Sequence, residues 1–384
     1  MTATSSPPAR IVIIGGGTGG TVTANRLAEK LHSEIDAGEA DITLVTDGPQ
    51  HVYKPMWLYV AFNRKDVEES YRPHREVLDD RVNLAIDRVT DIEPDAHQIQ
   101  TADRTEPIEY DRLVVATGAT IEEPRIEGFD EHGQHFYTAD GALELKERLA
   151  GFEGGELVLS TIGVPHMCPA APVEFVLIAD EWLSRRGLRE DTEITYTYPI
   201  HAAHEVRTLA DWIEPTFEAR DITLKTAFEV EAVDADTLYA ADGRTLEHDL
   251  LVGIPPHAGS DLVRESSLGE EWIDVDNRTL EVRGANDIYA LGDATNVPTS
   301  KAGSAAHYQA GVVADRLASE VRGELPTARY DGKTLCFVEA GLDEATYIEF
   351  DYDSDPVVRD PSGIVHYAKL GYNESYWLTA RGLI

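Results

Sequence analysis

Lysine is scarce in this chain. Only eight lysines occur in 384 residues, and all basic residues together number 33 against 70 acidic ones. The formal net charge is -37. A surface this acidic repels nucleic acid and anionic lipid. We therefore expect no nucleic-acid partner.

Long apolar runs are also missing. No stretch approaches the ~18 apolar residues of a membrane-spanning helix, and the first ten residues, MTATSSPPAR, contain no apolar core of a signal peptide. The chain is 42% hydrophobic and long enough for two or three domains with their own cores. We expect a soluble, cytoplasmic, globular protein.

The acidic residues are spread along the whole chain and form no tail. Such a distribution suits a solvating shell in high salt, where counterions screen the repulsion between like charges. The composition therefore indicates a halophilic protein.

A glycine-rich stretch, Arg10 to Lys30, is the part around which the chain is organised. A short apolar strand, Ile11 to Ile14, runs into a turn with Gly15, Gly17 and Gly20, and a helix follows. This G-x-G-x-x-G pattern between strand and helix is typical of a dinucleotide-binding βα unit, with phosphates at the helix N-terminus. A structural turn without a ligand is the alternative.

A second apolar strand, Ile42 to Thr46, ends in Asp47, which would bind a ribose hydroxyl. The interval from Gly20 to Asp47 exceeds the usual ~20 residues because a polar insert, Ser33 to Asp41, lies between them. The connection that follows, GPQHVYKPMWLYVAF, either folds over a planar ligand or packs as an ordinary loop.

Two later strands end at positions where their backbone would meet the same ligand. Arg112 to Gly118, RLVVATG, is a buried strand that ends in a glycine turn, and NDIYALGDA ends in Gly292-Asp293, whose carboxylate can accept a hydrogen bond from a ribityl hydroxyl. A helix predicted over Lys301 to Leu317 would favour negative charge at its N-terminus. Three separated segments on one extended ligand indicate FAD.

A second βαβ pattern follows, with a strand at Glu156 to Ile162 and a helix at Pro172 to Arg186. The turn between them, GVPHMCPAAP, has Gly163 as its only glycine and carries Cys168. No phosphate cradle is predicted there, so we expect no nicotinamide site.

Only one other cysteine exists, Cys336, far along the chain. The two could be unrelated buried cysteines. However, a loop cysteine near a helix N-terminus is expected to have a lowered thiol pKa, which suits a reactive thiolate. Glu174, in the first turn of the same helix, would act either as a proton acceptor or as an acid that complements the helix dipole.

Several segments of the chain resemble segments of a known protein family. The segments that carry the resemblance are GGGTGG from Gly15, HVYKP from His51, VVATGA from Val114, MCPAAPVEF from Met167, LGDAT from Leu291, KAGSAAHYQA from Lys301 and CFVEAG from Cys336. They are similar to the sulfide:quinone oxidoreductases and the flavoprotein of flavocytochrome c sulfide dehydrogenase, within the pyridine nucleotide-disulfide oxidoreductases.

The resemblance implies an α/β fold with two Rossmann-like domains, as in glutathione reductase, and a short C-terminal segment. The FAD domain would comprise 9–119 and 283–325, the second domain 120–282 without a glycine-rich NAD turn, and the C-terminal segment 326–384. The cofactor-binding residues expected from motifs and resemblance together are Gly15, Gly17, Thr18, Gly19, Gly20, Asp47, Lys54, Val89, Ala116, Thr117, Gly118, Gly292, Asp293, Lys301 and Ala302; no metal is expected.

The resemblance also implies the chemistry. Cys168 and Cys336 would form a redox pair beside the flavin, with Glu174 as the adjacent carboxylate. Sulfide or a related sulfur compound would attack the disulfide or a bridging polysulfide, leaving a persulfide on Cys336 and a thiolate on Cys168 that passes two electrons to the flavin. A quinone would accept them.

Two features depart from the family. Its third cysteine is absent, and the aromatic tail from His366 is short. That tail would pack on the protein and cover the flavin, form a homodimer, or touch the inner face of the cell membrane. The alternatives for function are a type II NADH:quinone oxidoreductase or a ferredoxin reductase, both disfavoured by the missing second glycine turn, and a flavin-binding redox sensor with a regulatory disulfide.

The acidic composition generates one prediction. The melting temperature should rise from low to molar salt, because added counterions screen repulsion among the acidic side chains. Thermal unfolding followed by circular dichroism across this range measures it, and an unchanged melting temperature would refute the halophilic interpretation.

Overall fold

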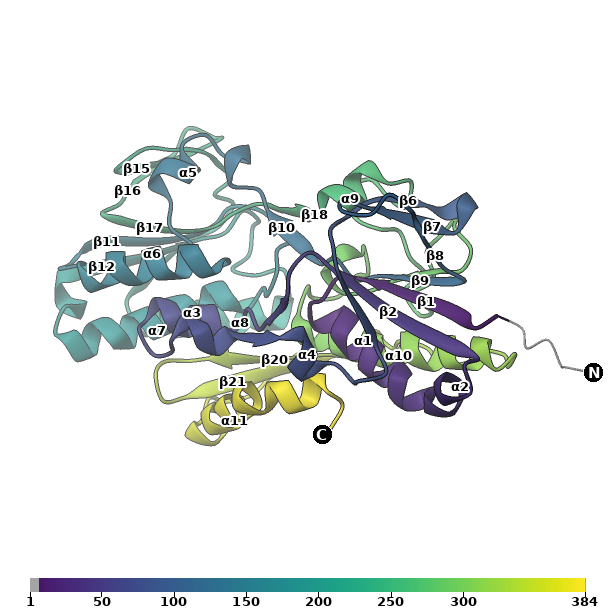
Figure 1. Ribbon diagram of the computed structural model, residues 1–384. Helices are drawn as coiled ribbons and strands as arrows, with labels where there is room; N and C mark the ends of the chain where they lie inside the picture. The colour runs from purple at the N-terminus through teal and green to yellow at the C-terminus, as the bar shows by residue number, and fades with distance from the viewer. Residues whose placement is uncertain (1–6, 384) are drawn as a thin grey trace, which may run out of the picture.

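Two parallel β-sheets with flanking helices form two lobes, and a smaller antiparallel sheet lies with the C-terminal helix along one side of both (Figure 1). This computed structural model describes residues 7–383. The predicted α/β class, with two Rossmann-like units and a C-terminal segment, is confirmed.

The first lobe contains a five-stranded parallel sheet with the strand order β19-β9-β1-β2-β5. Its strands are β1 (Ala9–Ile14), β2 (Ala40–Thr46), β5 (Asn83–Ile86), β9 (Arg112–Val115) and β19 (Ile288–Ala290). The apolar runs of the central strands are buried on both faces, as expected for a parallel sheet covered by helices. Because the strands are parallel, the residues that follow β1, β2, β9 and β19 all lie at one edge.

Helix α1 (Thr18–Lys30) and helix α10 (Gly303–Val321) pack against each other on this sheet. Leu27 of α1 and Val313 of α10 are completely buried in the resulting core. The short helix α2 (His32–Asp36) follows α1. A small antiparallel sheet, β6 (Val89–Glu93), β7 (Gln98–Thr101) and β8 (Ile108–Glu109), is attached to the same lobe together with α9 (Asp261–Glu265).

The second lobe contains a four-stranded parallel sheet with the order β13-β12-β11-β17. The strands are β11 (Gly155–Thr161), β12 (Thr192–Thr197), β13 (Ile222–Lys225) and β17 (Leu250–Ile254), and the helices are α5 (Phe129–His132), α6 (Ala139–Ala150), α7 (Ala171–Arg186) and α8 (Arg207–Glu218). A second small sheet, β14 (Val230–Val233), β15 (Thr237–Ala240) and β16 (Thr245–Glu247), extends it. The antiparallel pair β10 (Ala119–Ile121) and β18 (His257–Gly259) joins the two lobes (Figure 1).

The third sheet is antiparallel and consists of β20 (Thr334–Glu339), β21 (Ala345–Phe350) and β22 (Val357–Val358). Helix α7 packs on β20, and the C-terminal helix α11 (Gly363–Ala380) packs on β20 and β21. The connection after β2 forms β3 (Gln50–Val52), α3 (Met56–Ala61), β4 (Tyr71–Pro73) and α4 (His74–Val77). Every residue of α3 is buried.

Helix α11 buries a stripe of mostly polar side chains against the rest of the protein. The stripe has helical spacing and consists of His366, Lys369, Asn373, Tyr376 and Ala380. The tail therefore packs on the protein itself, one of the three roles considered for it. Among residues 7–383, no helix has both the length and the apolar character needed to cross a bilayer.

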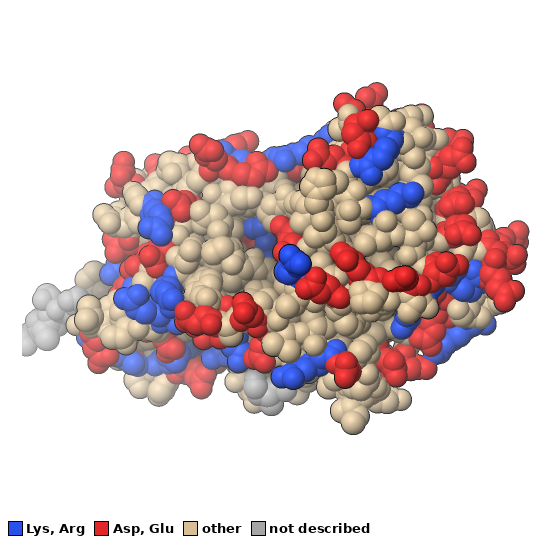
Figure 2. All heavy atoms as spheres, turned by 180° about the vertical axis from the view of Figure 1, so that it is seen from behind, with Lys and Arg blue, Asp and Glu red and all other residues tan. Residues whose placement is uncertain are grey.

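The acidic side chains cover the surface broadly. Figure 2 shows Asp and Glu distributed over the whole face seen from behind, with fewer Lys and Arg between them. Several lysine and arginine side chains of the protein form ion pairs, such as Lys30 with Asp315 and Arg283 with Asp276. The surface thus matches the charge distribution expected from the sequence.

The fold generates a prediction about Asn25, on the buried face of α1. Its amide donates to the carbonyl oxygens of Val77, at 2.9 Å, and Ala380, at 2.7 Å, and its oxygen accepts from the backbone N–H of Asp79. Asn25→Ala should lower the free energy of unfolding by about 1 to 3 kcal/mol, since it leaves buried backbone groups without partners. Denaturant unfolding measures this. Asn83→Ala, at an exposed site, should change stability much less.

Candidate functional site

The glycine-rich turn between β1 and α1 has the geometry that its glycines require. Gly15 has a φ of +105°, and a Cβ on it would lie 2.4 Å from the carbonyl oxygen of Ala116. A Cβ on Gly20 would lie 1.9 Å from the carbonyl oxygen of Gly15. Gly17 differs, because a Cβ there would meet no protein atom within 4 Å. The first and last glycines therefore allow close packing, whereas the space at Gly17 is open for a ligand.

The ends of β9 and β19 meet this turn. The backbone N–H of Ala116 donates to Ile14 at 2.8 Å, and that of Leu291 donates to Val115 at 3.1 Å. Gly292 follows in the left-handed region, with a φ of +72°. Three segments far apart in the sequence are thus joined at one edge of the sheet, where open α/β sheets bind their ligands.

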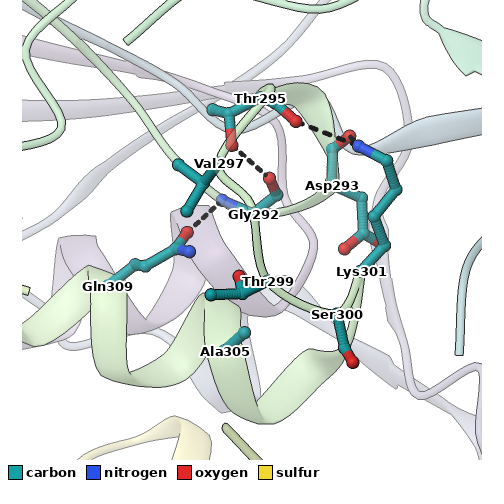
Figure 3. Close-up of a pocket in the computed structure, with 9 residues that line it drawn as sticks. All are labelled: Gly292, Asp293, Thr295, Val297, Thr299, Ser300, Lys301, Ala305 and Gln309. Atoms are coloured by element: carbon teal, nitrogen blue, oxygen red, sulfur yellow. Dashed lines mark hydrogen bonds between the residues drawn. The ribbon is translucent and has the colours of Figure 1, made fainter. Parts of the chain in front are cut away.

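A pocket lies beside Gly292, between the end of β19 and the start of α10 (Figure 3). Gln309 of α10 accepts a hydrogen bond from the Gly292 N–H at 2.7 Å. The Lys301 ammonium donates to the carbonyl oxygens of Asp293 and Thr295, each at 2.9 Å, and lies 3.5 Å from the ring centre of Trp272. The Lys301 side chain is therefore held in place by the backbone around Asp293.

The charges around this pocket are strongly perturbed. Burial raises the pKa of Asp293, and the ammonium groups of Lys301 and Lys54 oppose this. Burial lowers the pKa of Lys301 to about 8, although Asp293 favours its charged form. The charges of both lysines therefore act on the Asp293 carboxyl group, even though Lys54 comes from the connection after β2. Lys54 Nζ also lies 3.6 Å from the Met167 sulfur.

Several buried polar atoms near the glycine-rich turn have no hydrogen-bond partner within residues 7–383. They include Thr117 Oγ1 and both ring nitrogens of His74, whose ring contacts the position of a Gly16 Cβ. Buried polar groups normally have a partner. Together with the open space at Gly17, these atoms fit a polar, extended ligand such as FAD.

Cys168 lies in the loop before α7 and is attached to the first lobe. Its backbone N–H donates to the carbonyl oxygen of Lys301 at 2.7 Å, and its own carbonyl accepts from Ala171 at 2.9 Å. Its φ is +48°, an unusual backbone conformation for a residue with a side chain. Such strain is often found at functional sites. The hydrogen bond to Lys301 places the cysteine loop directly beside the pocket of Figure 3.

Cys336 approaches the same region from β20. The residue before it, Leu335, donates its backbone N–H to Ser304 Oγ at 3.4 Å, near the start of α10. Both cysteines are free thiols of intermediate exposure, and both pack against the same apolar cluster. The two cysteines are thus brought to the start of α10 from opposite directions, 168 positions apart in the sequence.

The expected lowering of the Cys168 thiol pKa is wrong for this structure. Each thiol keeps some accessible surface, but the surrounding protein raises the pKa of both. The negative charge of Glu174 raises each pKa further. The N-terminus of α7 does not compensate, since desolvation outweighs the effect of a nearby helix end.

Glu174 lies in the first turn of α7, where it is 6% exposed. Its Oε1 atom accepts a hydrogen bond from the backbone N–H of Glu339 at 2.8 Å and is ion-paired with Lys369 of α11. Burial raises the pKa of Glu174, and Lys369 opposes this increase. The carboxylate therefore has a specific partner beyond the helix dipole.

The turn between β11 and α7 provides no counterpart to the first glycine-rich turn. A Cβ on Gly163 would lie 3.1 Å from Pro256, so this position is closely packed. The loop that follows contains His166, which is completely buried, and Cys168. The position of a second phosphate-binding turn is thus taken by the cysteine loop.

Comparison with known proteins agrees with the motifs. The family profile of the pyridine nucleotide-disulphide oxidoreductases matches residues 9–161. The mitochondrial sulfide:quinone oxidoreductase of the mouse, Mus musculus, is 25% identical over 366 residues, which cover 91% of this chain and 80% of the relative.

The solved structure of the sulfide:quinone oxidoreductase from Aquifex aeolicus superposes with a TM-score of 0.85 at 22% identity, covering 97% of this chain and 92% of that one. The resemblance to the sulfide:quinone oxidoreductases is confirmed. The protein is an FAD-dependent oxidoreductase with the pyridine nucleotide-disulphide oxidoreductase fold.

The fold alone does not distinguish this chain from NADH-linked relatives. NDH2 from Plasmodium falciparum, solved in complex with NADH, superposes with a TM-score of 0.73 at 13% identity, and the match covers 97% of each chain. The distinction between these enzymes must come from the residues of the site.

The structure places most of the expected cofactor residues of this oxidoreductase along one edge of the first sheet. Asp47 is exposed immediately after β2, and Ala302 is buried immediately before α10. Thr18 begins α1, and its hydroxyl is bonded to that of Tyr376 at 2.8 Å. Val89 is the exception, because its side chain is buried in the core at the start of β6.

The sequence analysis did not identify the buried polar and charged side chains around Glu174. They are Tyr59 of α3, Glu339 of β20, and His366 and Lys369 of α11. Two signals pointed to them: Lys369 is one of only eight lysines, and the polar residues of the tail recur at helical spacing. Neither signal identifies a partner, because the contacts join distant segments.

The open space at Gly17 generates a prediction. Gly17→Ala should reduce FAD affinity at least about tenfold, or ~1.4 kcal/mol, because the added methyl group would occupy space that the fold itself does not use. The melting temperature of the flavin-free protein should stay unchanged. Flavin titration by fluorescence measures the affinity. Gly371→Ala, also without protein atoms within 4 Å, is the matched control and should bind FAD normally.

Proposed function

We propose that this oxidoreductase oxidises sulfide, or a related sulfur compound, through Cys168 and Cys336 and passes two electrons through FAD to a quinone. One observation carries the proposal: the Cys168 N–H is bonded to the carbonyl of Lys301, beside Asp293 and the expected cofactor edge. The names of the relatives supply sulfide and quinone as candidate substrates.

The cofactor would lie along the edge formed by the ends of β1, β2, β9 and β19. The turn from Gly15 to Gly20 would receive the pyrophosphate at the N-terminus of α1, Asp47 the ribose, and Asp293 the ribityl chain. Lys54 and Lys301 would lie near the redox-active ring. When bound, FAD would accept two electrons from the cysteine pair and release them to the acceptor.

The cysteines would work as a disulfide in the oxidised protein. The sulfur of sulfide attacks Cys336, a new sulfur–sulfur bond forms there, and the bond between Cys336 and Cys168 breaks. Cys168 leaves with the electron pair as a thiolate, so the incoming sulfur is oxidised and Cys168 is reduced. We assign Cys168 to the cofactor side, because its backbone is attached to Lys301.

The proposed electron acceptor and the proposed cellular location of the reaction are supported by the names of the same relatives and by the exposed face of α11. The outer face of α11 exposes Ile364, Tyr367 and Leu378, with Ile364 83% exposed. An apolar helix face of this kind can rest on a membrane surface, where a quinone is dissolved. We therefore propose peripheral contact with the inner face of the cell membrane.

The proposal predicts the outcome of replacing either cysteine. Cys168→Ser and Cys336→Ser should each abolish reduction of the bound flavin by sulfide while leaving FAD bound, since neither residue lies in the glycine-rich turn. The double variant should be little worse than either single variant, because the two residues act as one unit. Anaerobic stopped-flow absorbance of the flavin, with a soluble quinone added afterwards, measures each step.

NADH serves as the control reductant. It should reduce the flavin far more slowly than sulfide does, because the loop at Gly163 to Pro172 has no phosphate cradle. Rapid bleaching by NADH would favour the type II NADH:quinone oxidoreductase. If Cys168→Ser or Cys336→Ser still reduces its flavin with sulfide at the rate of the parent protein, the cysteine mechanism is wrong, and the two cysteines have a structural or sensing role.

A further inference from the structure

A cluster of buried charges lies where α3, α7, β20 and α11 meet; the loop with Cys168 leads into α7, and Cys336 lies in β20. Lys369 of α11 is ion-paired with Glu174 of α7, and its ammonium lies 3.9 Å from Oε1 of Glu339 in β20. The side chains are 9%, 6% and 1% exposed, in that order. Three charged groups are therefore held almost without water.

The second carboxylate of the cluster has partners of its own. Glu339 accepts hydrogen bonds from the Tyr59 hydroxyl at 2.5 Å and pairs with His366 Nδ1 at 2.8 Å. Its backbone N–H, in turn, donates to Glu174. The Glu339 carboxylate thus has hydrogen-bond partners of its own, and Lys369 is the cation that is paired with Glu174.

The charge of Lys369 extends to the cysteines. Desolvation lowers the pKa of Lys369, but Glu174, Tyr59 and Glu339 together raise it above its ordinary value, so the lysine stays protonated. Its positive charge lowers the pKa of Cys168, of Cys336 and of Glu174, against the burial that raises each of them. No other lysine or arginine among residues 7–383 forms an ion pair with Glu174.

We propose that Lys369 is a positioning residue of the cysteine site. It holds the Glu174 carboxylate ionised beside Cys168 and Cys336, so that Glu174 takes the proton of the sulfur nucleophile that attacks the pair. This inference rests on the proposed function for the identity of that nucleophile, whereas the electrostatic role of Lys369 does not depend on it.

Transfer of a proton from hydrogen sulfide to Glu174 balances the charges when sulfide attacks the disulfide. Hydrogen sulfide gives its proton to Glu174 as its sulfur bonds to Cys336, and the Cys168 sulfur leaves with the electron pair. The carboxylate becomes neutral, and the negative charge moves to the Cys168 thiolate. Lys369 favours both anions, the carboxylate before the attack and the thiolate after it.

The test compares four variants, one of them a control, over a range of pH. The titratable or charged groups whose electrostatics are coupled to that of Glu174 are Lys369, Glu339, Cys168, Cys336, Tyr59 and Tyr137. Lys369→Met should move the acidic limb of kcat/KM for sulfide up by about 1 to 3 pH units, the usual effect of losing a close opposite charge. Lys369→Arg should restore most of the profile.

Glu339→Gln should move the same limb in the opposite direction, because the negative charge of Glu339 raises the pKa of Glu174. This variant keeps Lys369. If Lys369→Met does not fold, Glu339→Gln still tests whether the charges of the cluster set the acidic limb of the profile. Lys333→Met is the matched control. It removes a lysine at the start of β20 that is 43% exposed and paired with Glu349, and the profile should not move.

A second measurement needs neither sulfide nor flavin reduction. In the reduced protein, the rate of thiol alkylation by iodoacetamide reports the thiolate fraction at each pH. Lys369→Met should raise the thiol pKa, so the alkylation profile should move to higher pH and the rate at a given pH should fall. If the parent enzyme does not oxidise sulfide but alkylation shifts, the proposed function fails and the role of Lys369 stands. Alkylation and kcat/KM profiles that coincide with those of the parent would overturn the role of Lys369.

Discussion

The structure depends on one buried ion pair, Glu174 with Lys369, which joins the second lobe to the C-terminal helix. Removing one partner from a buried pair typically costs about 3 to 5 kcal/mol, because the other charge is left without compensation. The pair also borders β20 through the Glu339 N–H. Displacing α11 would therefore leave the Glu174 carboxylate without its cation, so the docking of this helix also sets the electrostatics of the proposed cysteine site.

The two lobes divide the chemistry between them. The first builds the cofactor edge from local glycine turns and from strands that the chain supplies at widely separated positions, β1 near its start and β19 near residue 290. The second repeats the order of four of these strands, with β13, β12, β11 and β17 in the places of β5, β2, β1 and β9, but its turn holds Cys168 and no phosphate cradle. A loop that would bind a second nucleotide thus approaches the first cofactor site through the bond to Lys301.

The structural elements that could be predicted from the sequence are formed by residues close together along the chain. The strand, turn and helix at Gly15 to Gly20 follow from apolar periodicity and glycine spacing, and the strand ending at Gly118 follows from a short apolar run. The partners of Glu174 could not be predicted in this way, because Lys369 lies 195 positions away. The thiol pKa of Cys168 was predicted with the wrong sign, since helix position is visible in a sequence and burial is not.

The hydroxyl contact between Thr18 and Tyr376, 358 positions apart, has a consequence for biosynthesis. Chains emerge from the ribosome N-terminus first, and domains generally fold as units. Here the glycine-rich turn is among the first segments made, whereas β19, the fifth strand of its sheet, is made much later, and α11, which contacts α1, later still. The contact between Thr18 and Tyr376 can therefore form only after α11 has been synthesised, long after the turn that it contacts.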